Sequence, residues 1–346
     1  MSSKIKSILK ISLSLGFGLF LVYLFYSKLS TTDKEEMFNA VKNANYWWLV
    51  FSVSFTLVSQ SLRSMRYQGL LSAMGYEIGF IRAFNSISIN YLVNIGIPRA
   101  GEFARSGVLA SYNGIPVQKS FGATINERFV DVLLLLGTGV LCFLLQYEVF
   151  LNFYLSYLAE SFQNLLLWLQ NHWLASLALG LAALGLFIWF WKFLFAHDKK
   201  ESKFQQIVHG IKDGVFSIMH LKRPWLFILQ SVAIWICYYF MIYFAFKTIE
   251  QGEVLGYGAA LSLLFFGTFG FLATPGGIGA YPLLAGYLLA MYGLEAHLGN
   301  TIGWILWVGQ TILIIILGIA AFVKLSREKS WHPNLFQDES KIDISR

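Results

Sequence analysis

Long runs of apolar residues, separated by shorter polar segments, dominate the sequence. An α-helix needs about 20 apolar residues to cross a hydrocarbon core of about 30 Å. Six runs reach or approach that length: Ile8–Tyr26, Tyr46–Leu62, Phe129–Gln146, Trp173–Phe195, Trp225–Phe246 and Thr301–Val323. Tryptophans mark several of their ends, as in an interfacial aromatic belt. The pattern predicts an all-α polytopic membrane protein with about six full spans.

Two further apolar stretches do not fit an ordinary span. Ala83–Ile97 is short, rich in Asn and Ser, and followed by Pro98, whereas Tyr257–Tyr292 is interrupted by Thr274-Pro275-Gly276-Gly277. Pro and Gly free backbone groups that need protein or water around them inside a membrane. We therefore expect two re-entrant or broken helices in addition to the six spans.

The order of these elements predicts a 4+4 inverted repeat. Each half reads as two spans, one broken element and one more span, and the two broken elements would start from opposite sides of the membrane. In many secondary transporters built this way, the broken helices meet near the membrane midplane. Any even division of eight apolar stretches would look symmetric, so the hypothesis depends on the matching positions of the two breaks.

The distribution of basic residues predicts the orientation. All but four of the 26 Lys and Arg residues fall on one side of the predicted spans, the exceptions being Lys28, Lys34, Lys42 and Lys247. Cytoplasmic loops of membrane proteins carry such an excess. We therefore expect both termini to lie in the cytoplasm.

Composition supports the membrane class and argues against several other classes. Charged residues make up 13% of the chain, against about 25% in soluble domains. The net charge of +7 comes from residues between spans and does not indicate nucleic-acid binding. The 2 Cys and 6 His residues show neither a disulfide framework nor metal-ligand spacing, so we expect no metal and no cofactor. We expect one membrane domain, residues 1–324, and a cytoplasmic tail, residues 325–346.

Charged residues follow the first break, where the chain reads Asn94-Ile95-Gly96-Ile97-Pro98-Arg99-Ala100-Gly101-Glu102-Phe103-Ala104-Arg105. On a helix, Arg99, Glu102 and Arg105 would form a ladder of alternating charge. An arginine fork suits a phosphate and remains charged in a low dielectric. The ladder indicates either a phosphate-headgroup site at the mouth of a membrane cavity or a solvated cytoplasmic loop.

A second charged cluster, Glu127, Arg128 and Asp131, stands at the predicted start of the third full span. Ionisable groups in a membrane helix usually face a cavity or a partner. The cluster favours a structural ion pair with the segment Arg99–Arg105 over direct contact with a substrate. Acidic residues would also suit an interfacial helix start, where they complement the helix dipole.

The second break reads Ala273-Thr274-Pro275-Gly276-Gly277-Ile278-Gly279-Ala280-Tyr281. Exposed backbone N–H groups at a glycine-rich helix start can bind an anion, although this segment lacks the Gly-Lys-Ser/Thr of a P-loop. The alternative is a kink that packs closely through its small residues. We expect the break to be functional, as an outer gate.

These three motifs, in this order, resemble the lysylphosphatidylglycerol synthase transmembrane region family, the flippase-like membrane proteins of bacteria and archaea. The resemblance covers nearly the whole chain. Larger relatives join this domain to a cytosolic aminoacyltransferase that builds lysyl-lipid, while the membrane part moves the lipid between leaflets. Since only a short tail follows the last predicted span, we expect the synthase domain to be absent here.

The residues and the resemblance together predict a lipid flippase or lipid-linked carrier of the bacterial inner membrane. Its cargo would be a membrane phospholipid or a polyprenyl-linked lipid, and the chain would act alone or as a homo-oligomer. The expected substrate-binding residues are Asn94, Arg99, Glu102, Arg105, Glu127, Arg128 and Asp131. The expected helix-break or gate residues are Pro98, Gly101, Thr274, Pro275, Gly276, Gly277, Gly279 and Tyr281.

Within this interpretation, Arg99 and Arg105 would hold a phosphate, and the acidic residues would balance charge or bind an amine. Two alternatives remain. The protein could be an enzyme acting on a lipid-linked substrate, with Glu102 or Asp131 as the base, or a noncatalytic partner of a separate synthase.

Overall fold

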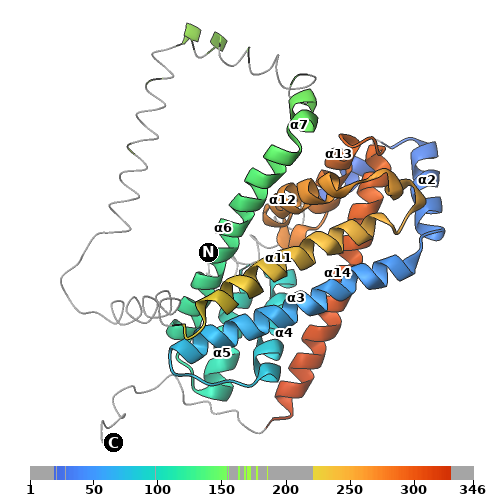
Figure 1. Cartoon of the computed structure of the whole chain (residues 1–346). Helices are drawn as coiled ribbons and strands as arrows, with labels where there is room; N and C mark the ends of the chain where they lie inside the picture. Colours follow the sequence, from blue (N-terminus) through green and yellow to red (C-terminus); the bar gives the residue numbers. More distant parts are fainter. Residues whose placement is uncertain are drawn as a thin grey trace, which may run out of the picture. The chain divides into compact units, whose positions relative to one another are not determined.

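The computed structural model describes residues 19–20, 22–27, 29–97, 99–153 and 221–328, with a few isolated positions between 155 and 185. Every regular element in these residues is a helix (Figure 1). Pro98, most of the predicted span Ile8–Tyr26 and nearly all of Trp173–Phe195 lie outside the described residues. Two compact units can be distinguished, Met1–Leu145 with Ile207–Arg346, and Gln146–Gln206.

The second unit contains the short helix α7 (Tyr147–Phe153). All other helices below belong to the first unit. The predicted division into a membrane domain, 1–324, and a tail, 325–346, stays a prediction.

Four long helices frame the first unit: α3 (Tyr46–Ala73), α6 (Val117–Leu145), α11 (Pro224–Phe246) and α14 (Ala296–Ser326). The last three are long and apolar enough to cross a membrane. α3 is as long but more polar, because its buried face carries hydroxyl, amide and guanidinium groups. The chain is therefore an all-α membrane protein, while the number of spans stays a prediction.

Besides α14, which begins at Ala296 instead of Thr301, two of these helices extend well beyond the apolar runs that predicted them. The predicted span Tyr46–Leu62 continues as α3 to Ala73, so the residues after Leu62 are not a loop. The predicted span Phe129–Gln146 starts earlier, at Val117, so Glu127 lies roughly three turns inside α6. The prediction of a helix start at Glu127 was wrong. Hydropathy revealed neither extension, because the polar residues in these segments face other helices instead of lipid.

Helices α3 and α11 pack side by side along their length (Figure 1). They run antiparallel, since the Asn45 N–H donates to the Thr248 carbonyl at one end and Arg66 contacts Ser231 towards the other. Between these points the Ser52 hydroxyl donates to a backbone carbonyl of α11. Without a hydrophobic driving force between helices in lipid, such hydrogen bonds and close packing hold the pair together.

Helices α4 (Phe80–Gly96) and α5 (Gly101–Asn113) form a hairpin that turns back partway along the molecule. α4 starts at the C-terminal end of α14, where Arg82 pairs with Glu328. α5 returns to that same end, where the Tyr112 hydroxyl donates to the Leu325 carbonyl. This hairpin contains the first predicted break.

The second hairpin consists of α12 (Tyr257–Ala273), the 3-10 turn η4 (Pro275–Gly277) and α13 (Ala280–Ala290). It follows α11 and the 3-10 helix η3 (Glu250–Val254), and returns to the N-terminal end of α14. The two hairpins therefore start from opposite ends of α14.

The tips of the two hairpins meet. A Cβ atom built at Gly276 would lie 4.0 Å from the Cα atom of Ile95. This is the meeting of broken helices that the repeat requires, and the inverted repeat itself stays a prediction.

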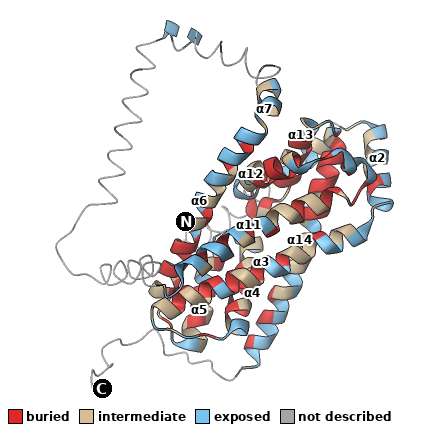
Figure 2. Ribbon diagram, viewed as in Figure 1, coloured by how far each residue is buried: buried red, intermediate tan, exposed pale blue. Residues whose placement is uncertain are grey.

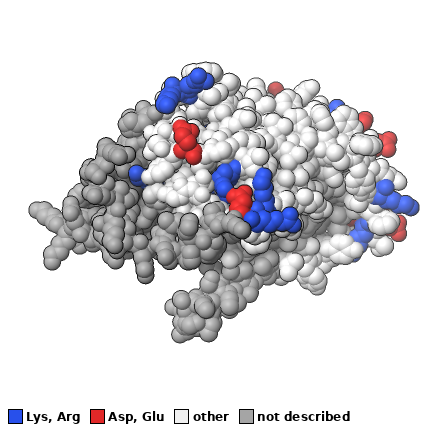
Figure 3. All heavy atoms as spheres, turned by 90° about the horizontal axis from the view of Figure 1, so that it is seen from below, with Lys and Arg blue, Asp and Glu red and all other residues white. Residues whose placement is uncertain are grey.

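The outer surface of the helices is largely apolar. Figure 2 shows buried residues where helices face one another and exposed residues along their outer sides. On α6 the exposed positions include Leu136, Val140 and Leu144. Figure 3, a view from below, shows Lys, Arg, Asp and Glu of the described residues in a few groups, with uncharged residues between them. A surface of this kind is suited to lipid.

Glycine is required at the second break because the backbone there is left-handed. Gly276, Gly277 and Gly279 have φ angles of 61°, 78° and 72°, which residues with a Cβ atom strongly resist. A Cβ atom at Gly277 would also lie 2.7 Å from the ring of Phe271. The predicted break is confirmed, and its turn depends on these glycines.

We expect Gly277→Ala to destabilise the protein more than Gly293→Ala. Both residues have positive φ, and alanine at either should cost about 1 kcal/mol for the backbone alone. Only Gly277→Ala adds a collision, since nothing lies within 4 Å of a Cβ at Gly293. The measurement is the midpoint of thermal unfolding in detergent. Equal midpoints for the two variants would show that the Phe271 ring moves aside without lowering the stability of the protein.

Candidate functional site

A cavity of about 380 Å³ lies where the two hairpin tips meet α3, α6, α11 and α14. Aliphatic and aromatic side chains form much of its wall. The longer polar side chains that line it are Gln60, Arg63, Tyr91, Asn94, Arg128, Tyr238, Tyr281 and Gln310. An apolar pocket with a few converging polar groups is the usual form of a small-molecule site.

Arg63 supplies positive charge to the cavity wall. Its Nη1 atom lies 3.0 Å from Asp131 Oδ2, and its Nε donates to the Tyr238 hydroxyl at 2.8 Å. The side chain is 10% exposed. These contacts use Nη1 and Nε and fix the guanidinium group, so that Nη2 is placed to donate to a further acceptor.

Behind the cavity wall, Arg66 shares one carboxylate with Arg63 and a second with Arg105. Arg66 lies 3.0 Å from Asp131 and 3.4 Å from Glu127, and Arg105 lies 2.7 Å from Glu127. Arg66 is fully buried, and the others are nearly so. The network joins α3, α5 and α6 and confirms the predicted ion pair between Glu127 and the segment Arg99–Arg105.

The network carries surplus positive charge. Three guanidinium groups, of Arg63, Arg66 and Arg105, are balanced by only two carboxylates, of Glu127 and Asp131. An uncompensated buried charge costs several kcal/mol. The cavity wall at Arg63 therefore favours an anionic occupant.

Arg128 marks a mouth of the cavity. It lines the cavity, yet its side chain is 46% exposed. Its Nε atom lies 3.3 Å from Glu102 on α5 and its Nη1 3.8 Å from Asp131. Because Glu102 neutralises Arg128, the surplus charge stays with the buried arginines.

The predicted ladder of Arg99, Glu102 and Arg105 does not form on one helix. Arg99 precedes α5, is exposed, and has a φ of 64°, the left-handed region. Glu102 and Arg105 lie in α5 but pair with Arg128 and Glu127. The turn before α5 breaks the helical spacing that the ladder assumed.

The other predicted residues divide between the cavity and the two turns. Asn94, Arg128, Gly276 and Tyr281 line the cavity. In the first turn, the Gly101 N–H donates to Asn94 Oδ1 at 2.8 Å, and a Cβ at Gly101 would collide with the Asn90 carbonyl.

The second turn is held by hydrogen bonds within it and to α14. The Thr274 hydroxyl donates to the Ile278 carbonyl at 2.9 Å, and the Trp307 indole donates to the Gly276 carbonyl at 2.7 Å. Pro275 and Gly277 are buried in this turn. Both turns are therefore specified by contacts to their neighbours.

Sequence analysis missed Arg63 and Arg66, which it placed in a cytoplasmic loop. A signal was present, because α3 carries a buried polar stripe at helical spacing: Ser52, Thr56, Ser59, Gln60 and Arg63. A stripe of this kind, continuing past an apolar run, predicts a helix that faces a polar interior.

A separate group of potential metal ligands, Glu36, Glu295 and His297, lies near the N-terminal end of α14. None of the three lines the cavity.

The family model for the lysylphosphatidylglycerol synthase TM region matches residues 8–318 and confirms the resemblance seen in the motifs. No curated protein and no solved structure matches the chain.

We expect Glu127→Gln to destabilise the protein far more than Glu102→Gln. Removing one partner of a buried ion pair costs about 3–5 kcal/mol, and Glu127 is shared by Arg66 and Arg105. Glu102 pairs with the half-exposed Arg128, and such a pair contributes about 0–1 kcal/mol. The measurement is the fraction of monodisperse protein that survives heating in detergent. Equal survival would mean that the buried network contributes little to stability.

Proposed function

We propose that this chain, which belongs to the lysylphosphatidylglycerol synthase TM region family, moves a lipid with a phosphate headgroup across its membrane. The surplus positive charge beside the cavity supports this proposal most directly. Three buried guanidinium groups and two carboxylates leave the cavity wall suited to an anion at Arg63.

In the proposed mechanism, the headgroup enters the cavity past Arg128 while the acyl chains stay in lipid. Arg63 binds the phosphate with its remaining N–H donors, and Asn94 and Gln310 offer further polar groups from the wall. Asp131 holds Arg63 in place and also pairs with Arg66, which is linked to Arg105 through Glu127. This modifies the expectation that Arg105 itself binds the phosphate, since Arg105 does not line the cavity.

The two hairpin tips would control access to the cavity. Ile95 and Gly276 both line it, one from each hairpin. Because the hairpins start from opposite ends of α14, opening at one tip or the other would connect the cavity to one leaflet at a time. A cargo of phospholipid or polyprenyl-linked lipid fits this arrangement, since both carry a phosphate.

Lipid movement is tested with the purified protein in liposomes, without a synthase or soluble substrate. We expect Arg63→Gln to abolish movement of acyl-labelled phosphatidylglycerol because the cavity loses its phosphate ligand. The fold should survive, since Asp131 keeps its ion pair with Arg66. Arg82→Gln is the matched control, because Arg82 pairs with Glu328 and does not line the cavity.

An uncharged glycolipid should move more slowly and respond little to Arg63→Gln. If the wild-type protein moved no lipid, transport would be refuted and the enzyme or accessory role favoured. Wild-type rates in Arg63→Gln would instead mean that the phosphate binds elsewhere.

We propose that the membrane is the bacterial inner membrane, with both termini cytoplasmic. Lys34 and Lys42 lie in α2 (Thr31–Lys42), and Lys247 ends α11, at the end of the molecule opposite to the Arg82–Glu328 pair. This end carries few basic residues, as expected outside the cytoplasm.

Cysteine labelling of intact cells tests the orientation, in a background without Cys142 and Cys237. We expect an impermeant thiol reagent to label cysteine at Lys42 but not at Asn113, which ends α5. Both positions are exposed, so accessibility is matched. Labelling at Asn113 alone would show that the orientation is the reverse of the one proposed.

A further inference from the structure

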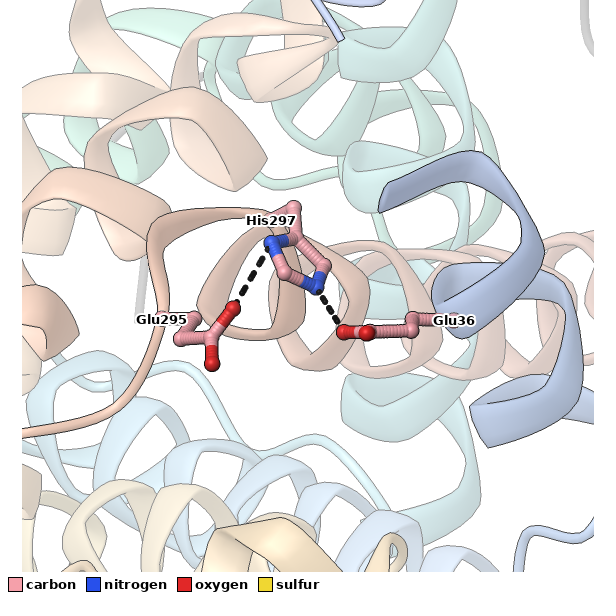
Figure 4. A group of neighbouring side chains, drawn as sticks. All are labelled: Glu36, Glu295 and His297. Carbon is pink, nitrogen blue, oxygen red and sulfur yellow. Dashed lines mark hydrogen bonds and ion pairs between the residues drawn. The ribbon is translucent and has the colours of Figure 1, made fainter. Parts of the chain in front are cut away.

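His297 lies in the first turn of α14 and is surrounded by carboxylates from two helices. Its side chain is 6% exposed. Nε2 lies 2.9 Å from Glu36 of α2, and Nδ1 lies 3.5 Å from Glu295, the N-cap residue of α14. Figure 4 shows these two carboxylates on opposite sides of the ring. A third acid, Asp33, has Oδ1 3.8 Å from Nδ1.

The cluster holds more negative charge than the imidazole can balance. Even a protonated His297 would leave an excess of two negative charges among Asp33, Glu36 and Glu295. The neighbouring Lys34 lies over the Tyr26 ring, with its Nζ atom 4.6 Å from the centroid, and contributes a single charge. The cluster would therefore be stabilised by a further cation.

Asp33 is held in place and ionised by the start of α2. The Ser30 backbone N–H donates to Asp33 Oδ2 at 2.9 Å. This bond, with the contact to the Ser30 hydroxyl, holds the pKa of Asp33 below its ordinary value. At neutral pH Asp33 is a carboxylate whose other oxygen faces His297.

We propose that Nδ1 of His297 and the carboxylates of Asp33 and Glu295 bind a divalent metal ion of the zinc class. Zinc binds imidazole nitrogen and carboxylate oxygen at about 2.0–2.2 Å, which puts neighbouring ligand atoms roughly 3.3–3.5 Å apart. Glu295 and Asp33 lie 3.5 and 3.8 Å from Nδ1, close to this separation, and the exposed side chain of Glu295 can turn to bring its carboxylate beside that of Asp33. The exposed carboxylate of Glu295 leaves room for water to complete the coordination.

Glu36 has a different role in this site. By accepting a hydrogen bond from Nε2–H, it fixes the tautomer in which Nδ1 presents its lone pair to the metal. Carboxylates commonly orient metal-binding histidines in this way. A bound ion would join α2, which leads into α3, to the start of α14.

The sequence alone could not reveal this site. Asp33 and Glu36 are remote from Glu295 and His297 along the chain, and only the packing of α2 against α14 brings them together. The expectation of no metal came from local spacing, which such a site does not have.

Zinc binding is tested with tag-free protein in detergent, by competition with a chromophoric chelator at neutral pH. We expect one zinc ion per chain in the wild type. His297→Gln should remove binding, because its amide can still donate to Glu36 but offers no ring nitrogen. Glu36→Gln should weaken binding about 10–100-fold, as loss of an orienting partner does. Glu250→Gln, at an exposed acid of η3, is the control and should bind normally.

Gel filtration and thermal unfolding with and without zinc keep the test independent of folding defects. A zinc-dependent rise in the unfolding midpoint, present in Glu250→Gln and absent in His297→Gln, would support the site. No binding by the wild type, or equal binding by His297→Gln, would overturn it. Zinc binding needs no lipid movement, so it does not depend on the proposed transport.

Discussion

The architecture depends on a charge imbalance that the protein holds inside a membrane domain. Arg63, Arg66 and Arg105 share the carboxylates of Glu127 and Asp131, and these five groups come from α3, α5 and α6. Each arginine would be costly to bury alone. The network therefore fixes the positions of three helices relative to one another, including a helix of the first hairpin. It also leaves positive charge at the cavity wall, where Arg63 is exposed to an occupant.

The hairpin tips and Arg63 line the same cavity. Each turn breaks a helix and frees backbone groups that lipid could not satisfy. The second turn is largely buried, whereas the first includes the exposed Ile97 and Arg99. The Gly101 N–H donates to Asn94 in the first turn, and the Gly276 carbonyl accepts from Trp307 in the second. Because the tips meet beside Arg63, the same turns that break the helices also form the cavity wall. The turns of the two hairpins and the charge of Arg63 therefore meet at the same cavity.

Sequence reasoning predicted the parts of the fold that lipid determines and missed those that protein contacts determine. The apolar runs predicted α11 within one residue, and Thr274-Pro275-Gly276-Gly277 predicted the second break. Hydropathy failed for α3, because Arg63 and Arg66 read as loop residues until their partners on α6 are known. For the site, local spacing correctly suggested that Glu127 pairs with the segment after the first break. It could not predict that Arg99 leaves the helix, since that depends on the turn before α5.

The hydrogen bond from Trp307 to Gly276 gives the second turn an energetic preference between conformations. The accepting carbonyl belongs to Gly276, whose backbone is left-handed. Because the helix is broken there, the indole N–H takes the place of a helical N–H donor. If the turn moved away, the partly buried indole N–H would lose its acceptor, at a cost of about 1 kcal/mol. That cost alone would favour the observed conformation about fivefold over the displaced one. A ligand that offset this cost would shift the equilibrium towards the displaced turn. The hydrogen bond from Trp307 of α14 would then set how strongly the turn is held in its observed conformation.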